Sequence, residues 1–331
     1  MSYVTVEDQR LNYIDKNQKE LRADSYKSVK EATDERLREA ARADGLYTDD
    51  HSRPAIGRKI LPSSVTGTPR FFNKKFQDGM AICREYSKPD LFITMTCNSG
   101  WDEIVDELLP QQKAQDRPDI VARVFKLKKE QMKKDIIKGS LFGKIAAHLN
   151  TNEWQKRGLP HDHGLYILAA EDRNMSSEFV DSIVSAELPP DPNEASNDVE
   201  KEQRERMQEI VTKCMIHGPC GNEKPSAPCM ENGKCSKGFP KPFQKDTIVD
   251  TENSYATYRR RSPADGGRTI QINGRTVDNS WVVPYNPYLS LRYKAHINVE
   301  FCISPKAVKY LCKYTLSIYF YLCTLFINLY M

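Results

Sequence analysis

Residues 143–170 constrain the fold most, because they contain two extended segments joined by a short turn. The first segment reads GKIAAHLNTNEW and the second reads PHDHGLYILAA, with a Lys-Arg-Gly turn between them. Segments of this kind, connected this closely, pair as an antiparallel hairpin. We therefore predict an antiparallel sheet that contains this hairpin.

Other stretches of the chain predict a mixture of further strands and helices. Residues 91–97 alternate between apolar and other side chains, and turn-forming residues flank them on both sides, as in a strand. Apolar residues three and four apart in 72–83 predict a helix that begins near Pro69. Residues 119–138 form a second amphipathic helical pattern, rich in lysine. The predicted fold class is therefore α+β.

Changes in composition divide the chain into segments. Residues 1–60 are highly charged with mixed signs, which is typical of a solvated helix or a disordered arm. A body with apolar periodicity follows over 61–186, and it resumes over 251–316. Between these parts we expect a polar linker and a Cys/His-rich insertion at 187–250, where 187–206 is acidic and rich in proline. Residues 317–331 form an atypical apolar tail.

Charge and cysteine content restrict the class of protein. The formal net charge is only +4 over 331 residues, so any nucleic-acid surface must be a local concentration of positive charge. The nine cysteines are an odd number, and the polar N-terminus has no secretory pattern. We therefore expect a reducing compartment, in which clustered cysteines are metal ligands before they are disulfides.

The histidine pair in the predicted hairpin is a candidate metal site. In a strand His161 and His163 point to one face and Asp162 to the other. Two imidazoles a few ångströms apart can share a divalent cation, with a further ligand from the neighbouring strand. Three side chains offer that ligand: Glu153, which is the best placed, and then His148 and Gln155. The alternative is a pair of polar residues at the entrance of a strand.

A tyrosine pair near the end of the chain is a candidate nucleophile. Ser304 and Pro305 provide the start signals of a helix, so Tyr310 and Tyr314 would share one face of it. Nearby cations favour the phenolate form of a tyrosine. The lysines that supply this charge are Lys306, Lys309 and Lys313. The alternative interpretation is ordinary packing of aromatic side chains in a core.

A cysteine cluster in the insertion has spacing close to that of zinc ligands. The pattern C-x₂-H-x₂-C followed by C-x₅-C consists of Cys214, His217, Cys220, Cys229 and Cys235. The best set comprises the first three and either Cys229 or Cys235. The alternative is a group of free thiols.

Several of these segments together resemble a known family. They are GTPRFFNKKFQDGMAICREYSKPDLFITMTCNSGWDEI, NEWQKRGLPHDHGLYIL, CMIHGPCG, PCMENGKCSKGFPKPF, WVVPYNPYLSLRYKAHINVE and KYLCKYT, in that order. This resembles the N-terminal, Rep-like endonuclease region of Helitron rolling-circle transposases, also described as the Helitron helicase-like domain. The resemblance covers residues 60–315 approximately.

The resemblance implies an HUH endonuclease, a class named after a His–hydrophobic–His motif. The implied fold is an antiparallel sheet flanked by helices, with residues 91–96 as the central strand beside the histidine strand. His161 and His163 would hold Mg²⁺ or Mn²⁺, with Glu153 as the third ligand. Asp162 departs from the hydrophobic middle position, and we expect this to be tolerated because it faces away from the metal.

The implied activity is nicking and strand transfer of single-stranded DNA. Tyr310 or Tyr314 would attack a phosphate and become linked to the 5′ end, without a small-molecule cofactor, in the nucleus. Phosphates would be contacted by Lys156, Arg157, Arg292, Lys294, Lys306 and Lys313. Bases would stack on Trp154, Tyr285, Tyr288 and Tyr293. Zinc at the cysteine cluster would be structural.

Two further features depart from the family pattern. Full-length relatives continue into a helicase, whereas this sequence contains no G-x-x-x-x-G-K-[ST] phosphate loop. The uncharged residues 314–331 replace the basic continuation of the family, so we expect a chain truncated before the helicase. An inactive remnant that binds only DNA or zinc is the alternative function. A membrane anchor at 314–331 is a third, disfavoured interpretation.

Overall fold

The structure, a computed structural model, describes residues 2–17, 61–65, 68–154, 159–250 and 253–304. The chain divides into two compact units, residues 1–77 and 78–331. Each unit is described by itself below.

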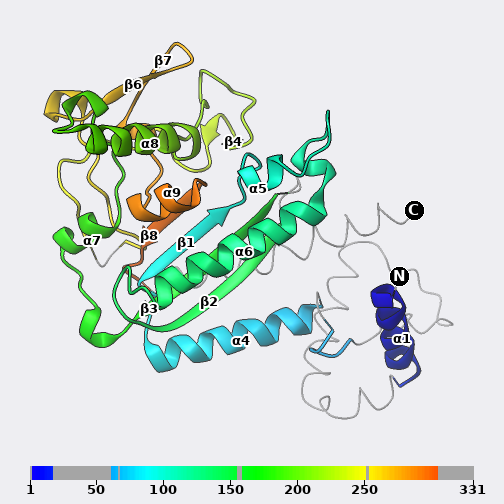
Figure 1. Cartoon of the computed structure of the whole chain (residues 1–331). Helices are drawn as coiled ribbons and strands as arrows, with labels where there is room; N and C mark the ends of the chain where they lie inside the picture. The colour runs from blue at the N-terminus through cyan, green and yellow to red at the C-terminus, as the bar shows by residue number, and fades with distance from the viewer. Residues whose placement is uncertain (1, 18–60, 66–67, 155–158, 251–252, 305–331) are drawn as a thin grey trace. The chain divides into compact units, whose positions relative to one another are not determined.

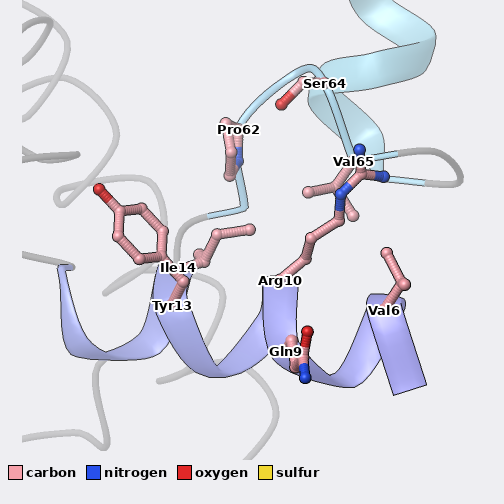
Figure 2. Close-up of a pocket in the computed structure, with 8 residues that line it drawn as sticks. All are labelled: Val6, Gln9, Arg10, Tyr13, Ile14, Pro62, Ser64 and Val65. Atoms are coloured by element: carbon pink, nitrogen blue, oxygen red, sulfur yellow. The ribbon is translucent and has the colours of Figure 1, made fainter. Parts of the chain in front are cut away.

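The first unit contains α1 (Ser2–Lys16) and the beginning of α4 (Pro69–Tyr86). Thr68 Oγ1 accepts a hydrogen bond from the backbone N–H of Phe71, so a side-chain cap starts α4 where the sequence predicts a helix. A pocket of about 460 Å³ lies between α1 and residues 62–65 (Figure 2). Its lining residues are Val6, Gln9, Arg10, Tyr13, Ile14, Pro62, Ser64 and Val65. None of these residues is an expected site residue, so the predicted chemistry lies elsewhere.

The second unit is built around a four-stranded sheet in the order β2-β3-β1-β8 (Figure 1). The strands are β2 (Ile145–Trp154), β3 (Pro160–Leu168), β1 (Leu91–Thr96) and β8 (Ile297–Phe301). Every neighbouring pair is antiparallel. The predicted hairpin strands and the strand at 91–96 are thus confirmed, and β1 lies between β3 and β8.

Helix α6 (Pro118–Ile137) lies across one face of this sheet (Figure 1). Its buried side chains Phe125, Met132 and Ile136 share a hydrophobic core with Ile93 and Met95 of β1 and with apolar residues of β8. Because side chains alternate along a strand, the apolar residues of β1 and β8 point to α6 and the intervening polar residues point to the opposite face. The histidine motif of β3 uses that opposite face. The α+β class with an antiparallel sheet is therefore confirmed.

The remaining elements of the second unit surround this core. They are α5 (Asp102–Val105), α7 (Ser177–Ile183), α8 (Asp198–Cys214), α9 (Pro287–Tyr293), the β4–β5 hairpin (Met230–Glu231 and Lys234–Cys235) and the β6–β7 hairpin (Thr269–Ile272 and Arg275–Asp278). Among the described residues, no helix has the length and apolar character needed to cross a membrane. Residues 314–331, considered above as an anchor, lie outside the described residues.

Part of the segment 187–206, which we expect to belong to a polar linker and insertion, is helical, because α8 begins at Asp198. Asn197 caps α8 by accepting the N–H of Glu200, and two i,i+4 ion pairs, such as Glu200–Arg204 at 2.6 Å, follow on the helix surface. The buried side chains of α8 begin only at Met207. The first turns of the helix carry no apolar stripe, which is why the sequence pattern did not predict it.

A buried carboxylate fixes the start of β1. Asp90 is fully buried, and its carboxylate accepts the N–H of Leu168 at 2.8 Å. Arg173 Nε lies 3.1 Å from the same carboxylate, and Lys88 Nζ lies 3.8 Å away. Burial raises the pKa of Asp90, although these partners act to lower it. The network ties β1 to the far end of β3.

Replacing Arg173 with alanine is expected to destabilise the second unit by about 3 kcal/mol at pH 7, because the Asp90 carboxylate would stay buried without its main cation. The raised pKa means that the folded state binds the proton more tightly, so stability falls as the pH rises through this pKa. Removing Arg173 raises the pKa further. The loss of unfolding free energy caused by Arg173→Ala, called here the deficit, should therefore become smaller as the pH is lowered from 7 towards about 4.

Urea unfolding of the variant at several pH values measures this deficit. Lys144→Ala is the matched control, because its ion pair with Glu171 is exposed on both sides and should contribute less than about 1 kcal/mol. An Arg173→Ala deficit that stayed constant between pH 7 and pH 4 would contradict the assignment to Asp90.

Candidate functional site

The β2–β3 register gathers the expected metal ligands on one face of the sheet. Glu153 is paired directly with His161, and Thr151 with His163, so Glu153 and both histidines point the same way. His163 Nε2 lies 3.0 Å from Glu153 Oε2. The two imidazole rings have their centroids 6.2 Å apart. The sheet therefore brings the three expected ligands together.

Two threonines of β1 orient the histidine rings. Thr94 Oγ1 lies 3.0 Å from His163 Nδ1, and Thr96 Oγ1 lies 3.3 Å from His161 Nδ1. Each hydroxyl is the cross-strand neighbour of its histidine. A partner on Nδ1 fixes the ring and leaves Nε2 as the nitrogen suited to a metal.

The charges on this face suit a cation. Burial, together with the neighbouring His163 and His296, lowers the pKa of His161 to about 4, so this ring is neutral at neutral pH. The hydrogen bond with His163 lowers the pKa of Glu153 despite partial burial, which keeps this group a carboxylate. Neutral imidazoles and an ionised carboxylate are the forms that bind a divalent metal.

The other side chains considered at this motif lie elsewhere. His148 is paired with Tyr166 and stacks on its ring at 6.1 Å, on the face covered by α6. Asp162 is buried on that same face, where it accepts a hydrogen bond from Asn150 at 3.0 Å. Asp162 thus faces away from the histidines, as expected. Gln155 lies outside the described residues.

Three polar residues of the β8 segment also reach the histidine face, and sequence reasoning missed them. The N–H of Thr96 bonds to the carbonyl of His296, and Asn298 and Glu300 pair with Thr94 and Phe92. Their side chains therefore share the face of His161 and His163. The sequence HINVE alternates polar and apolar residues, which was the available signal.

A second cluster of metal-binding side chains lies in the insertion. One ligand atom from each of four residues lies within 4.8 Å of the others, and the residues are His217, Cys220, Cys229 and Cys235. His217 Nε2 is 3.3 Å from the sulfur of Cys235. One imidazole and three thiols could hold a metal ion in tetrahedral geometry.

The local sequence explains how Cys229 and Cys235 meet. Asn232 and Gly233 adopt positive φ angles of 51° and 76° in the tight turn between β4 and β5. An Asn-Gly pair is the preferred sequence of such a turn. Burial raises the pKa of Cys235, but backbone N–H groups of Phe239 and Lys237 bond to its sulfur and lower the pKa overall. N–H groups aimed at sulfur favour the thiolate that a metal requires.

The group differs from the expected ligand set, in which Cys214 came first and only one of Cys229 and Cys235 was used. Cys214 is the last residue of α8 and packs against the hydrophobic cluster around Met207 and Val211. Burial raises the pKa of its thiol. Both later cysteines take part instead.

The expected DNA-contacting residues fall into three groups. Lys156, Arg157, Lys306 and Lys313, together with Tyr310 and Tyr314, lie outside the described residues. Exposed candidates are Trp154, Tyr288, Arg292 and Lys294, of which Arg292 is paired with Asp135 at 2.6 Å. Tyr285 and Tyr293 are buried, and their hydroxyls bond to the Glu187 carbonyl and to Asp135. These two tyrosines are core residues and do not offer a stacking surface.

Comparison with known proteins gives one family. A family model described as the Helitron helicase-like domain at the N-terminus matches residues 1–166. The matched region includes Glu153, His161 and His163, and the Cys/His group lies beyond it. No protein of curated function matches the chain.

Proposed function

Because this chain belongs to the Helitron helicase-like N-terminal domain family, and is thereby a transposon-related protein with a DNA-related role, we propose that it is a metal-dependent endonuclease and strand transferase of single-stranded DNA. The observation that carries the proposal is the shared face of Glu153, His161 and His163, with Thr94 and Thr96 on the histidine Nδ1 atoms. A transposon product of this kind would act in the nucleus, and in full-length relatives beside a helicase on the same chain.

Glu153, His161 and His163 fit a divalent cation such as Mg²⁺ or Mn²⁺. The donors are one carboxylate and two oriented imidazoles, a set that leaves coordination positions for a phosphate oxygen. When bound, the ion supplies charge stabilisation at the phosphate. The chain's own residues hold the rings and the carboxylate in place. His163 and Glu153 already lie in contact at 3.0 Å.

The nucleophile in this proposal is Tyr310 or Tyr314. The tyrosine oxygen attacks phosphorus, the bond from phosphorus to O3′ breaks, and the 3′-hydroxyl leaves with the proton. The 5′ end remains as a phosphotyrosine. The second tyrosine can accept another 5′ end in the same way, which permits strand transfer without an external energy source.

The Cys/His group is proposed to hold structural zinc. Its donors, three sulfurs and one imidazole nitrogen, are a preferred zinc set, and its closed arrangement suits a structural role. The insertion around it has short strands and many turns, and such segments gain stability from a metal.

A covalent-adduct assay tests the proposed nuclease. The protein is incubated with Mn²⁺ and a 5′-unlabelled, 3′-labelled single-stranded oligonucleotide, and then separated on a denaturing gel. A labelled band of increased protein mass is expected, and it should disappear in the double variant Tyr310→Phe, Tyr314→Phe. An adduct that persists in this variant would disprove the tyrosine mechanism.

Replacing Thr94 with valine is expected to raise the Mn²⁺ concentration needed for half-maximal adduct formation by roughly 10-fold or more, because His163 loses the hydroxyl on Nδ1 while the side-chain volume is kept. The Mn²⁺ concentration that gives half-maximal adduct formation measures this. Thr151→Val, on the same face at the other side of His163, is the matched control. Equal Mn²⁺ curves for both variants would contradict a positioning role of Thr94.

A second candidate function is DNA or zinc binding without turnover. It is favoured by the Cys/His group, in which the four ligand atoms lie within 4.8 Å of one another. In that case the oligonucleotide would bind and no adduct would form at any Mn²⁺ concentration. The adduct assay therefore separates the two functions.

A further inference from the structure

We propose that the outer face of α6 binds the phosphate backbone of duplex DNA, on the side of the sheet opposite to the histidines. Four cations define this surface, called here the α6 basic face: Arg123, Lys126, Lys134 and Lys138. The inference goes beyond the proposed function, because it assigns a second DNA-binding surface that takes no part in strand cleavage.

The α6 basic face follows from the spacing of residues along the helix. Arg123 and Lys134 are separated by about three full turns, so they lie in one row along the helix axis. Lys126 is the i+3 neighbour of Arg123, and Lys138 is the i+4 neighbour of Lys134, so both lie on the same side. The buried side chains of α6 point to the sheet, and all four cations are exposed on the solvent side.

The charges of the α6 basic face are not neutralised by neighbouring carboxylates. In the described part of the chain, lysines of α6 form ion pairs at Lys128 and Lys129, with Glu103 and Glu130 respectively. None of the four cations of the α6 basic face has a carboxylate oxygen within 4.0 Å among the described residues. Their positive charge is therefore available to an anion.

Helix α8 shows the ordinary arrangement of charge on an exposed helix surface. Its charged side chains form three i,i+4 ion pairs, which are Glu200–Arg204, Glu202–Arg206 and Glu209–Lys213. Such pairs stabilise a solvent-exposed helix, whereas like charges at this spacing repel each other. The α6 basic face lacks these pairs and thus forms a local concentration of positive charge on a chain whose formal net charge is only +4. A partner with closely spaced negative charges would complement it.

The composition of the α6 basic face favours duplex over single-stranded DNA. Sites for single strands combine cations with aromatic side chains on which the bases stack. Phe125, the one aromatic residue in the sequence of α6, is buried against the sheet. From Arg123 to Lys138 the row extends over about 22 Å, at about 1.5 Å per residue, and therefore reaches several phosphates of a rigid duplex. DNA is the expected polyanion because the family has a DNA-related role.

The sheet separates the α6 basic face from the proposed nuclease site. The side chains of α6 share a core with the apolar face of β1 and β8, whereas Glu153, His161 and His163 lie on the opposite face. A single strand bound at the histidines and a duplex bound at α6 would therefore lie on different sides of the sheet. Substitutions on the α6 basic face should leave adduct formation on a single strand within about two-fold of wild type.

The salt dependence of duplex binding tests the inference with the full chain and no added divalent cation, so that no turnover is needed. Anisotropy of a fluorescein-labelled, blunt-ended duplex is measured between about 50 and 200 mM salt for the triple variant Arg123→Gln, Lys126→Gln, Lys134→Gln. Each lost phosphate contact on a duplex should reduce the slope of log K against log salt by about 0.9, so by about 2.7 for three contacts.

The matched control removes one arginine and two lysines that are exposed on α8: Lys201→Gln, Arg206→Gln, Lys213→Gln. The control should keep the wild-type slope with the duplex. Equal slopes in the two triple variants would overturn the proposal. A labelled oligothymidylate is measured in parallel, and a slope that falls as much with this single strand as with the duplex would overturn the assignment to duplex DNA.

A variant that gains affinity guards against a defect in folding. Glu130 is exposed between Lys126 and Lys134, so Glu130→Gln removes a negative charge from the middle of the α6 basic face. It should tighten duplex binding roughly 3-fold at low salt, whereas Glu205→Gln on α8 should not. Unchanged affinity in Glu130→Gln would contradict contact between the duplex and this face. Failure of the proposed nuclease would abolish the adduct without changing any of these slopes, so the two failures are distinguishable.

Discussion

Replacing His163 with alanine is expected to lower the rate of covalent adduct formation at least about 100-fold, the largest loss from any single substitution on the sheet. His163 contacts residues of both neighbouring strands. Its Nδ1 lies next to Thr94 Oγ1 of β1, and its Nε2 lies next to Glu153 Oε2 of β2. Its removal takes away one of the proposed metal ligands and the contact between His163 Nε2 and the Glu153 carboxylate. Adduct formation over time at saturating Mn²⁺ measures the loss.

The matched control is His148→Ala. His148 is an exposed histidine on the adjacent strand of the same sheet, and it points to the α6 face instead of the site. The control should keep the adduct rate within a few-fold of wild type, while both variants lose some stability through truncation of a packed ring. Comparable losses of rate in the two variants would mean that His163 acts through folding and would contradict a metal-binding role.

Because side chains alternate along a strand, the sheet face that carries His161 and His163 could be predicted from the sequence. His161 and His163 share a face for any strand, and the short turn required β2 to be their neighbour. The register was not predictable, because moving β2 by one residue would have turned Glu153 to the α6 face. In the structure the register of β2 on β3 places Glu153 opposite His161.

The family resemblance placed residues 91–96 beside the histidine strand, but it did not give the register that sets Thr94 and Thr96 against the histidines or the pairing that brings in His296. Thr94 and His163 are 69 residues apart and become neighbours only when β1 pairs with β3. Patterns within a single segment show which face a residue takes. They do not show which strands pair, since long-range pairing follows from the burial of the whole core.

The cysteines of the candidate metal site were partly predictable for a different reason. Spacing identified the cluster but not the membership of Cys214, because the end of α8 directs that side chain into the core around Met207. The Asn-Gly turn between Cys229 and Cys235 was a local signal that both belong to the group. Turn chemistry is more reliable here than counting the residues between cysteines.

Replacing Cys220 with alanine is expected to remove the bound zinc and to destabilise the second unit by at least about 4 kcal/mol, or roughly 10 °C in Tm. Cys220 is the buried member of the group and lies between His217 and the β4–β5 hairpin. Without Cys220, the three remaining ligands would hold the ion weakly. The turns from 217 to 241 would then lose the metal cross-link that stabilises them. Zinc content per chain and thermal unfolding measure the two effects.

Cys214→Ser is the matched control, because it removes the thiol that spacing alone made the first ligand but that lies outside the group. This variant should keep one zinc ion per chain and lose only about 1 kcal/mol, through a hydroxyl placed at the edge of a core. Zinc loss in Cys214→Ser with retention in Cys220→Ala would reverse the ligand assignment. The ligand set is thus decided by one pair of variants.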